Sequence, residues 1–247
     1  MNCDKDDGAK HHDKLTQHLA KDPESFKRLA QKKYETIVQT LPDKQYETIL
    51  SYGFNLVACG FALNGHDVHI TNCCMDCGSC IGLSNLIYED DLADLVSQGK
   101  KFDLVLAVDQ ALTYADTNED QRELIATFAS ITEKTLVTTV RDYRNQNHND
   151  KFFDEPFYIK QGDNERIVIN HRKWNRGDRQ AWNNYTYIID ENHNLDVVGP
   201  KKRRTLYFKQ LAKFLYDNGA KDYTVHKEPL YKSGFSKAFQ YIITAEF

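Results

Sequence analysis

The chain has 247 residues, a formal net charge of −4, 40% hydrophobic residues and 28% charged residues. This length suits one large α/β domain or two small ones, and the composition is ordinary for a soluble globular protein. The acidic excess argues against a polyanion as the main partner, and no apolar run approaches the roughly 18 residues that span a bilayer. The polar N-terminus lacks the apolar core of a signal peptide, so we expect a cytoplasmic protein without membrane contact.

The first part of the chain predicts a strand–helix–strand unit. Residues 1–23 are polar and weakly periodic, which favours a flexible lead-in before a single domain over residues 24–247. Apolar residues at helical spacing then predict a helix that Pro42 ends. The elements expected up to this point are a helix at 24–41, a strand at Glu47–Leu50, a buried helix at 55–63 and a strand at Val68–Thr71.

Strands and helices continue to alternate up to residue 140. The clearest buried strand is FDLVLAV, at Phe102–Val108, and the amphipathic run Asp116–Ile131 predicts a helix capped by Asp116 or Thr117. Further strands are expected at Leu86–Tyr88 and Lys134–Val140. This alternation is typical of an α/β protein with a doubly wound, mostly parallel sheet.

Residues 144–200 differ in character. They are rich in Asn, Asp, Tyr and Trp, and short alternating runs flank a turn at Asp190–Asn194, which predicts an antiparallel β insertion. Regular α/β order then returns. We expect a helix at Thr205–Asn218 and strands at Tyr223–His226 and Phe239–Ala245, the second of them as an antiparallel hairpin partner.

The order of these elements resembles that of the class I S-adenosylmethionine (SAM)-dependent methyltransferases over residues 24–143 and 200–247. The segments that carry the resemblance are GHDV at Gly65–Val68, EDDLADL at Glu89–Leu95 and FDLVLA at Phe102–Ala107. The resemblance implies a seven-stranded Rossmann-like sheet with an antiparallel last strand, SAM as the cofactor and a small-molecule substrate.

The glycine-rich first motif of that family is degenerate here. Counted back from Gly65, its three glycines fall on Ser51, Gly53 and Asn55, and its acid falls on Ile49. The acid that holds the cofactor ribose in the family falls on Asn72, whose carbonyl oxygen can still accept a hydrogen bond. The resemblance therefore implies cofactor contacts at Ser51, Gly53, Asn55 and Asn72, with binding that is weaker than usual or lost.

Other positions carry alternative interpretations. By the resemblance, Asp91 contacts the adenine amino group and Asp109 lies where the substrate meets the methyl donor, but Asp91 could equally cap a helix and Asp109 could be a loop acid. Gly53 could be a turn glycine only. We take Asp109, Tyr114 and Tyr143 as the catalytic candidates, with Asp109 also a cofactor candidate, because methyl transfer rests mainly on proximity and needs a base only for a protonated nucleophile.

Four cysteines fall within eight residues, in the loop after the second expected strand: Cys73, Cys74, Cys77 and Cys80. Four thiolates can bind zinc tetrahedrally, and iron–sulfur clusters use related spacings. A run this short closes poorly around one ion, since structural zinc sites usually draw on two separated knuckles. Small, half-buried thiols beside the cofactor cleft are the remaining interpretation.

Two further features leave alternatives open. The basic run Lys201–Arg204 could contact phosphates, although a solvated loop before the next helix is the favoured interpretation. The aromatic residues of the insertion, with Arg172 and Arg179 nearby, could form a lid over a planar or anionic substrate or simply its small core. These aromatic residues are Trp174, Trp182, Tyr185 and Tyr187.

Three hypotheses therefore stand. The first is a SAM-dependent methyltransferase acting on a small molecule. The second is a catalytically inactive methyltransferase-like module with a binding or regulatory role, which the missing acids at Ile49 and Asn72 favour. The third is an RNA methyltransferase that reads its substrate through Lys201–Arg204.

Overall fold

The computed structural model describes most of the chain. The described residues are 23–72, 82–89, 91–109, 111–141, 152–153, 156–161, 164–175, 177–229 and 239–247. The expected lead-in over residues 1–23 thus lies outside this part except for Pro23, which begins the first described helix.

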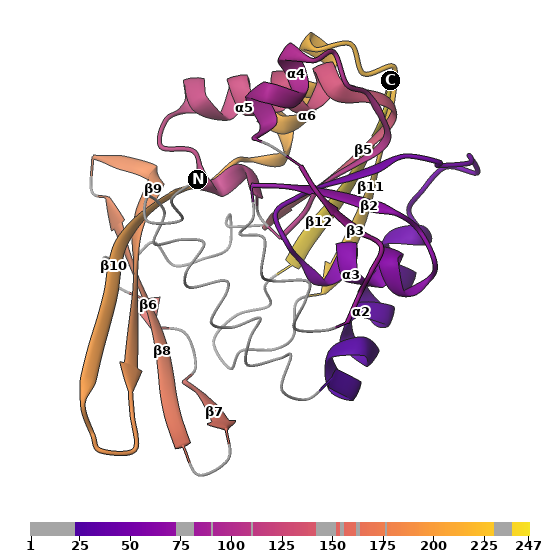
Figure 1. Cartoon of the computed structure of the whole chain (residues 1–247). Coiled ribbons are helices and arrows are strands. Elements are labelled where there is room, and N and C mark those ends of the chain that lie inside the picture. The colour runs from indigo at the N-terminus through magenta and orange to yellow at the C-terminus, as the bar shows by residue number, and fades with distance from the viewer. Residues whose placement is uncertain are drawn as a thin grey trace.

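A seven-stranded sheet forms the centre of the molecule, in the order β11-β12-β5-β4-β1-β2-β3 (Figure 1). Its strands are β1 (Ile49–Tyr52), β2 (Val68–Thr71), β3 (Leu86–Tyr88), β4 (Phe102–Ala107), β5 (Thr132–Arg141), β11 (Asp222–Pro229) and β12 (Phe239–Glu246). The first five pair in parallel, whereas β12 is antiparallel to both of its neighbours, β5 and β11. The predicted doubly wound sheet with an antiparallel last strand is confirmed.

Helices cover both faces of this sheet. α2 (Pro23–Val38) and α3 (Leu56–Leu63) pack on one face, and α4 (Leu92–Ser97), α5 (Asn118–Ile131) and α6 (Phe208–Asp217) pack on the other. Neighbouring strand residues point to opposite faces, so Ile49 belongs to the core under α2 and α3 while Leu50 belongs to the core under α5 and α6. The result is a three-layer sandwich with one core on each side of the sheet.

The two helices of the first layer are in very close contact. α3 is apolar on nearly all sides and buried, as the sequence predicts, and Gly60 lies against α2. A Cβ built on Gly60 would stand 2.5 Å from the Ala30 carbonyl oxygen and 2.6 Å from the Tyr34 Cβ. Only glycine therefore allows this approach of the two backbones.

Helix starts follow local capping chemistry. Thr117 caps α5 with a full capping box, in which its hydroxyl accepts from the Asp120 N–H and the Asp120 carboxylate accepts from the Thr117 N–H. The predicted start of the next helix at Thr205 is wrong, because the Thr205 N–H donates to the Gln180 carbonyl and continues the pairing with the insertion. α6 begins only at Phe208.

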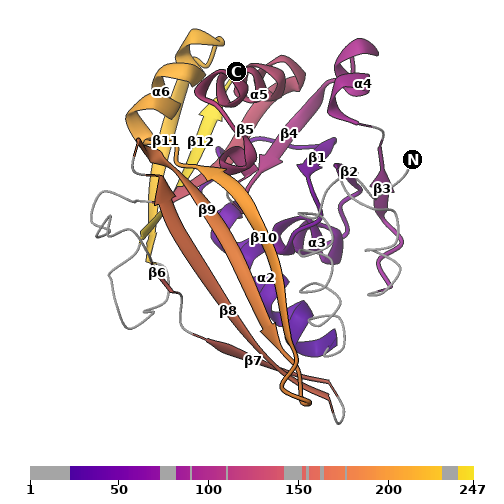
Figure 2. The ribbon, with the colours of Figure 1, turned by 90° about the vertical axis from the view of Figure 1, so that its left-hand side faces the viewer.

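The predicted antiparallel insertion is a second sheet, with the order β10-β9-β8-β6 and with β7 also paired to β8. Its strands are β6 (Phe152–Phe153), β7 (Phe157–Gln161), β8 (Asn164–Asn175), β9 (Asp178–Ile189) and β10 (Leu195–Arg204). The expected turn at Asp190–Asn194 is present, and the Asp190 carboxylate accepts from the backbone N–H groups of Asn192 and Asn194. This sheet stands in front of α2 and α3 when the molecule is viewed from its side (Figure 2).

The interpretation of Lys201–Arg204 as a loop is wrong. These residues form the last part of β10 and pair with β9 in register, Lys201 opposite Asn184 and Arg204 opposite Ala181. Their alternation along a strand, rather than the charge of the run, decides where each side chain points. Among the described residues, no helix is long and apolar enough to cross a membrane.

Candidate functional site

Three strand ends meet at the carboxyl edge of the parallel sheet. Register places Tyr52 opposite Thr71, and Ser51 opposite Leu106. If the β1–β4 register continues for two more residues, Gly53 lies opposite Val108. If the β1–β2 register continues for one more residue, Gly53 lies opposite Asn72. β1 lies at the point where the strand order reverses, and ligands of open α/β sheets bind at such a switch point.

Each of the three strands leaves this edge through a residue with left-handed backbone. Gly53 has φ +81, Asn72 has φ 55 and Asp109 has φ 53. Such values are uncommon for residues other than glycine, and they cluster at ligand-binding sites. A Cβ on Gly53 would meet no atom within 4 Å, so the backbone at this turn is open to a ligand.

The residues at the other two glycine positions hold the turn from within. Ser51 is fully buried in β1, so the tight turn begins later than the sequence predicted, and its hydroxyl donates to the Gly53 carbonyl at 2.9 Å. Asn55 caps α3, where its oxygen accepts from the Ala58 N–H and its amide nitrogen donates to the Ser51 hydroxyl at 2.8 Å. The Gly53 N–H donates to the Thr71 carbonyl and ties the turn to the end of β2.

These contacts restrict what Ser51 and Asn55 can do for a cofactor. Their side chains are buried and engaged with the loop itself, which leaves the backbone of the turn as the surface that a ligand would meet. Ile49 is fully buried among apolar residues of the core under α3, where a carboxylate would be costly. Asn72 is exposed directly after β2, so its amide is available at the edge.

Asp91 caps α4. Its carboxylate accepts from the Ala93 N–H at 2.7 Å, which is the capping alternative raised by the sequence, and its exposed position leaves contact with a ligand a prediction. The neighbouring Glu89 is bound by His69 at 2.5 Å and Lys100 at 2.7 Å. Burial alone raises the pKa of Glu89, but the hydrogen bonds from Lys100 and His69 outweigh it and hold the pKa below its ordinary value.

Asp109 is among the residues that line a narrow hollow between α2 and the strand ends, whose interior space of about 10 Å³ has room for about one water molecule. Apolar side chains line one part of it: Ile37, Val57, Val108 and Ile242. Polar side chains line the rest: Lys33, Thr36, Asp109, Thr139 and Gln240. The hollow as it stands is too small to enclose a small molecule, but its polar and apolar side chains lie together beside Asp109.

Tyr114 ends the short 3-10 helix η3 (Ala111–Tyr114), which follows β4 and Asp109. Its ring is 39% exposed, and the Arg203 guanidinium stacks over it with 3.8 Å from Cζ to the ring centroid. Buried Gln121 of α5 donates to the carbonyl oxygens of Leu112 and Arg204 at 3.0 and 3.2 Å. η3 is thereby held between α5 and the insertion.

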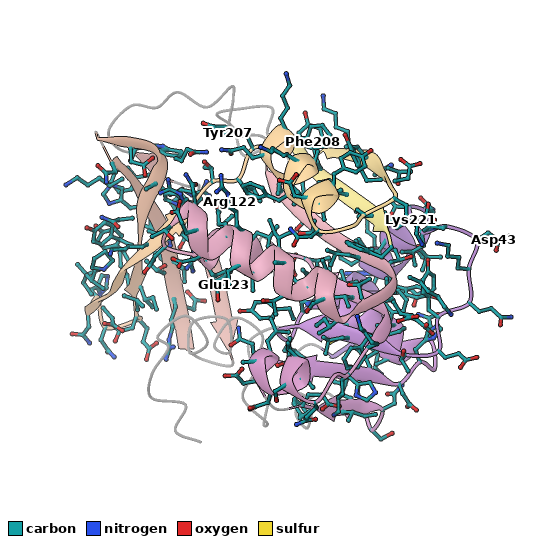
Figure 3. The ribbon with its side chains drawn as sticks, turned by 90° about the horizontal axis from the view of Figure 1, so that it is seen from above. Asp43, Arg122, Glu123, Tyr207, Phe208 and Lys221 are labelled. Carbon is teal, nitrogen blue, oxygen red and sulfur yellow. The ribbon has the colours of Figure 1, made fainter. Side chains whose placement is uncertain are left out.

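The insertion is anchored to the N-terminal end of α5. Arg204 donates to Asp178 at 2.6 Å and to Asn118 at 2.7 Å, and its side chain is nearly buried. Seen from above, the insertion strands lie beside the part of α5 that carries Arg122 and Glu123 (Figure 3). Sequence reasoning missed these roles of Gln121, Arg203 and Arg204; the strand alternation of residues 201–204 was the available signal.

Several candidate residues lie outside the described residues, namely Tyr143, Cys73, Cys74, Cys77 and Cys80. Their catalytic or metal-binding roles stay predictions. Among the residues that the structure does describe, no group of three or more His, Cys, Asp or Glu side chains is arranged to hold a metal ion. Cys59 is a buried cysteine of α3.

Comparison with solved structures identifies the fold. The methyltransferase CcbJ from Streptomyces caelestis has a TM-score of 0.64 at 12% sequence identity, over 88% of this chain and 89% of its own. SAM-bound CalS10 from Micromonospora echinaspora, an amino pentose methyltransferase, has a TM-score of 0.59 at 12% identity, over 89% and 91% of the two chains. The chain has the fold of the SAM-dependent methyltransferases.

A third similar structure is the sugar N-methyltransferase KedS8 from a Streptoalloteichus species, with a TM-score of 0.50 at 12% identity over 88% of this chain and 85% of its own. No protein-family model and no curated protein matches the sequence. The methyltransferase fold thus comprises the insertion as well as the central sheet, because the similarity extends over most of both chains.

Proposed function

We propose that this protein is a SAM-dependent methyltransferase that acts on a small molecule. The observation that carries the proposal is the row of three left-handed residues, Gly53, Asn72 and Asp109, at the strand-order switch point of a methyltransferase-type sheet. Sites of this kind place ligands outside the carboxyl ends of the strands. The strained backbone of two non-glycine residues there supports a functional role.

The residues present fit the cofactor in part. The open side of Gly53 and the N-terminus of α3 offer backbone to a ligand, and the exposed amide of Asn72 can hydrogen-bond a ribose hydroxyl. When bound, SAM supplies an electrophilic methyl group for in-line displacement. The absence of an acid at Ile49 and Asn72 predicts an affinity below that of a binding site with charge-assisted hydrogen bonds.

The acceptor site is proposed at the carboxyl edge of the sheet beside Asp109, over the mouth of the narrow hollow on the α2 side. Asp109 would orient a polar or amino group of the acceptor and would take up a proton if the nucleophile carries one. CalS10 is an amino pentose methyltransferase and KedS8 is a sugar N-methyltransferase. Amino sugars are therefore the first acceptors to test.

An inactive binding module is the second candidate. The internal hydrogen bonds of Ser51 and Asn55 favour it, because both side chains bind within the loop and are not available to a cofactor. The RNA methyltransferase hypothesis has weaker support. Arg203 and Arg204 are engaged with Tyr114, Asp178 and Asn118 instead of forming a free basic patch.

Calorimetric titration of SAM and S-adenosylhomocysteine tests the proposal. We expect wild-type protein to bind and Gly53→Ala to lose roughly tenfold or more in affinity, since the added methyl group enters the open side of the turn and a left-handed alanine costs about 1 kcal/mol. Gly65→Ala is the matched control: its φ is +88, a Cβ there also meets no atom within 4 Å, and it lies at the far end of α3. Absence of heat with wild-type protein would rule out the enzyme and favour the inactive module.

A further inference from the structure

The short helix η3 lies directly at the carboxyl end of β4. The Ala111 N–H donates to the Val108 carbonyl oxygen at 3.1 Å, so the chain turns back as soon as β4 has ended. A 3-10 helix rises about 2 Å per residue, so the Cα atoms of Asp109 and Tyr114 are no more than about 13 Å apart. η3 therefore belongs to the edge of the sheet at which the acceptor site is proposed.

Within η3, the last residue is the exposed one. Ala111, Leu112 and Thr113 are buried, whereas Tyr114 is 39% exposed. Ala111 and Leu112 belong to the core under α5 and α6, and this burial is enough to attach a helix of four residues. The aromatic ring of Tyr114 is therefore not required for the attachment of η3.

One face of the Tyr114 ring is covered by a cation from the insertion. The Arg203 Cζ atom lies 3.8 Å from the ring centroid, well within the roughly 6 Å at which a cation interacts with an aromatic face. The exposed area of Tyr114 therefore belongs to the opposite face and to the edges of the ring. Tyr114 thus offers a ring that is fixed from one side and that a ligand can reach from elsewhere.

The strand register of the insertion fixes where Arg203 can point. Arg203 stands directly opposite Trp182 in the pairing of β10 with β9, and Trp182 stands opposite Trp174 in the pairing of β9 with β8. Directly opposed residues of antiparallel strands point to the same side, so the three side chains form one row. Both indole rings are buried, with centroids 5.2 Å apart. A row that begins with two buried rings restricts the directions open to the arginine.

The junction between η3 and the insertion has contacts besides this stacked pair. The side-chain amide of Gln121 donates to the carbonyl oxygens of Leu112 and Arg204 at 3.0 and 3.2 Å. The Arg204 guanidinium donates to Asn118 at 2.7 Å. These hydrogen bonds attach both η3 and β10 to α5. A substitution in the stacked pair is therefore expected to leave the junction in place.

The charge distribution of an aromatic ring indicates what its accessible face can bind. The face carries partial negative charge and the edge carries partial positive charge. Such a face attracts the weakly positive C–H groups on the apolar side of a saturated ring, such as the ring of a sugar. When a sugar ring stacks in this way, its equatorial amino and hydroxyl groups point outward. The carboxylate of Asp109 lies at the same edge of the sheet and could bind one of them.

We propose that the acceptor stacks its sugar ring on Tyr114, and that Arg203 is the positioning residue that holds the Tyr114 ring for this contact. The proposal rests on the function proposed above, because it names a specificity-determining residue of that acceptor site. It gives the binding role to the ring of Tyr114 and not to its hydroxyl group, whereas the sequence made Tyr114 a catalytic candidate. Recognition of the acceptor then depends on a contact between the insertion and the central domain.

Binding and turnover of amino sugars test the proposal separately from cofactor binding. The full chain is titrated with S-adenosylhomocysteine by calorimetry and then, when saturated, with glucosamine, galactosamine and an amino pentose; methyl transfer from labelled SAM gives kcat and KM. We expect Tyr114→Ala to raise the KM of the best amino sugar about tenfold or more, with kcat and S-adenosylhomocysteine affinity within about twofold of wild type. Tyr114→Phe keeps the ring and is expected to regain most of this loss, and Arg203→Met is expected to raise KM about threefold.

Tyr216→Ala is the matched control, because Tyr216 is an exposed tyrosine of α6, and circular dichroism checks the folding of every variant. A Tyr114→Ala variant with the KM of wild type overturns the stacking contact, as does a Tyr114→Phe variant as impaired as Tyr114→Ala, which would assign the role to the hydroxyl. A wild-type KM in Arg203→Met overturns the positioning role of Arg203.

The two proposals fail in different ways. Wild-type protein that binds S-adenosylhomocysteine but none of the three amino sugars overturns the stacking contact and leaves the proposed cofactor site intact. Wild-type protein that does not bind S-adenosylhomocysteine rules out the proposed function and this proposal with it.

Discussion

Asn72 and Asp109 adopt a backbone conformation that favours glycine, although neither is glycine. A left-handed conformation costs most residues about 1 kcal/mol, and Asn and Asp tolerate it better than others because their side chains can hydrogen-bond locally. Glycine would relieve the strain but would remove an amide or a carboxylate from the carboxyl edge of the sheet. The polar group at each of these strand ends is thus retained against a conformational penalty.

Asp109→Asn separates the charge of this residue from its shape. Asparagine keeps the tolerance of a left-handed backbone, so we expect the free energy of unfolding to change by less than about 0.5 kcal/mol. If Asp109 accepts a proton or orients an amino group, methyl transfer from labelled SAM to amino sugars falls roughly 100-fold or more. S-adenosylhomocysteine affinity, measured by calorimetry, should change little; a large loss there would assign Asp109 to the cofactor instead.

A second prediction at the residue scale concerns Glu89 and the pH dependence of the free energy of unfolding. The pKa of its carboxyl group is lowered in the folded protein because Lys100 and His69 donate to it, more than offsetting the effect of burial. A lowered pKa gives stability that is complete above the ordinary glutamate value of about 4.3 and disappears as the pH falls through the folded value.

Glu89→Gln is therefore expected to lose roughly 1 kcal/mol of unfolding free energy at pH 7, where the ion pairs form, and to show a smaller decline than wild type below about pH 4.5. Urea unfolding at a series of pH values measures both. Parallel decline of the two proteins would mean that Glu89 does not contribute to the acid sensitivity.

At the scale of elements, the sequence pattern predicted those helices, strands and caps that depend on residues close together in the chain. The buried helix at 55–63 is α3 at Leu56–Leu63, and the strand at Val68–Thr71 has the bounds of β2. Thr117 as a helix cap was readable because its partner Asp120 is three residues away. The antiparallel partner at Phe239–Ala245 is β12.

What the sequence could not predict depends on distant contacts. The start of α6 shifts to Phe208 because Thr205 pairs with Gln180, and the role of Arg203 depends on Tyr114, 89 positions earlier in the chain. At the candidate site, the position of Asn72 and Asp109 at strand ends followed from the strand pattern. Their left-handed backbone and the hydrogen bonds of the Ser51 hydroxyl within the turn did not, since both are consequences of how the turn packs.

The substitution Gly60→Ala tests the contact between α2 and α3, because helix propensity and close packing predict opposite changes in the free energy of unfolding. Helix propensity alone predicts a gain of about 1 kcal/mol in stability from alanine at a helix interior position. The Ala30 carbonyl oxygen and Tyr34 Cβ would stand within 2.6 Å of the new methyl group, so we expect a loss of about 2 to 3 kcal/mol instead. Chemical denaturation of wild type and Gly60→Ala measures whether stability rises or falls. A more stable variant would contradict the close approach of α2 and α3.

At the scale of the whole molecule, a group of polar contacts around Arg204 joins the insertion to the helices of the central domain. Arg204 links β10 to Asp178 of β9 and to Asn118 at the start of α5, and the side-chain amide of Gln121 donates to the Arg204 carbonyl oxygen in the same corner. The same corner holds η3 and therefore Tyr114. The position of the insertion beside the candidate site depends on this junction.

Arg204→Met keeps the length of the side chain and removes its donors. We expect a loss of roughly 1 to 2 kcal/mol, because Asn118 and the partly exposed Asp178 lose a charged partner. Amide hydrogen exchange should rise in β9, β10 and η3 and remain unchanged in β1, β2 and β4. Lys202→Met, at an exposed position of the same strand, is the control; equal exchange in both variants would show that Arg204 does not anchor the insertion.

The position of β12 has a consequence for how the protein is made. β12 lies between β11 and β5, so β11, although synthesised first, pairs in the sheet only with β12. During synthesis, β5 must therefore wait with one open edge, and β11 with both edges open, until Phe239–Glu246 has left the ribosome. Open strand edges invite pairing with other chains. The interval before β12 emerges is thus the stage at which these open edges most expose the chain to pairing with other chains.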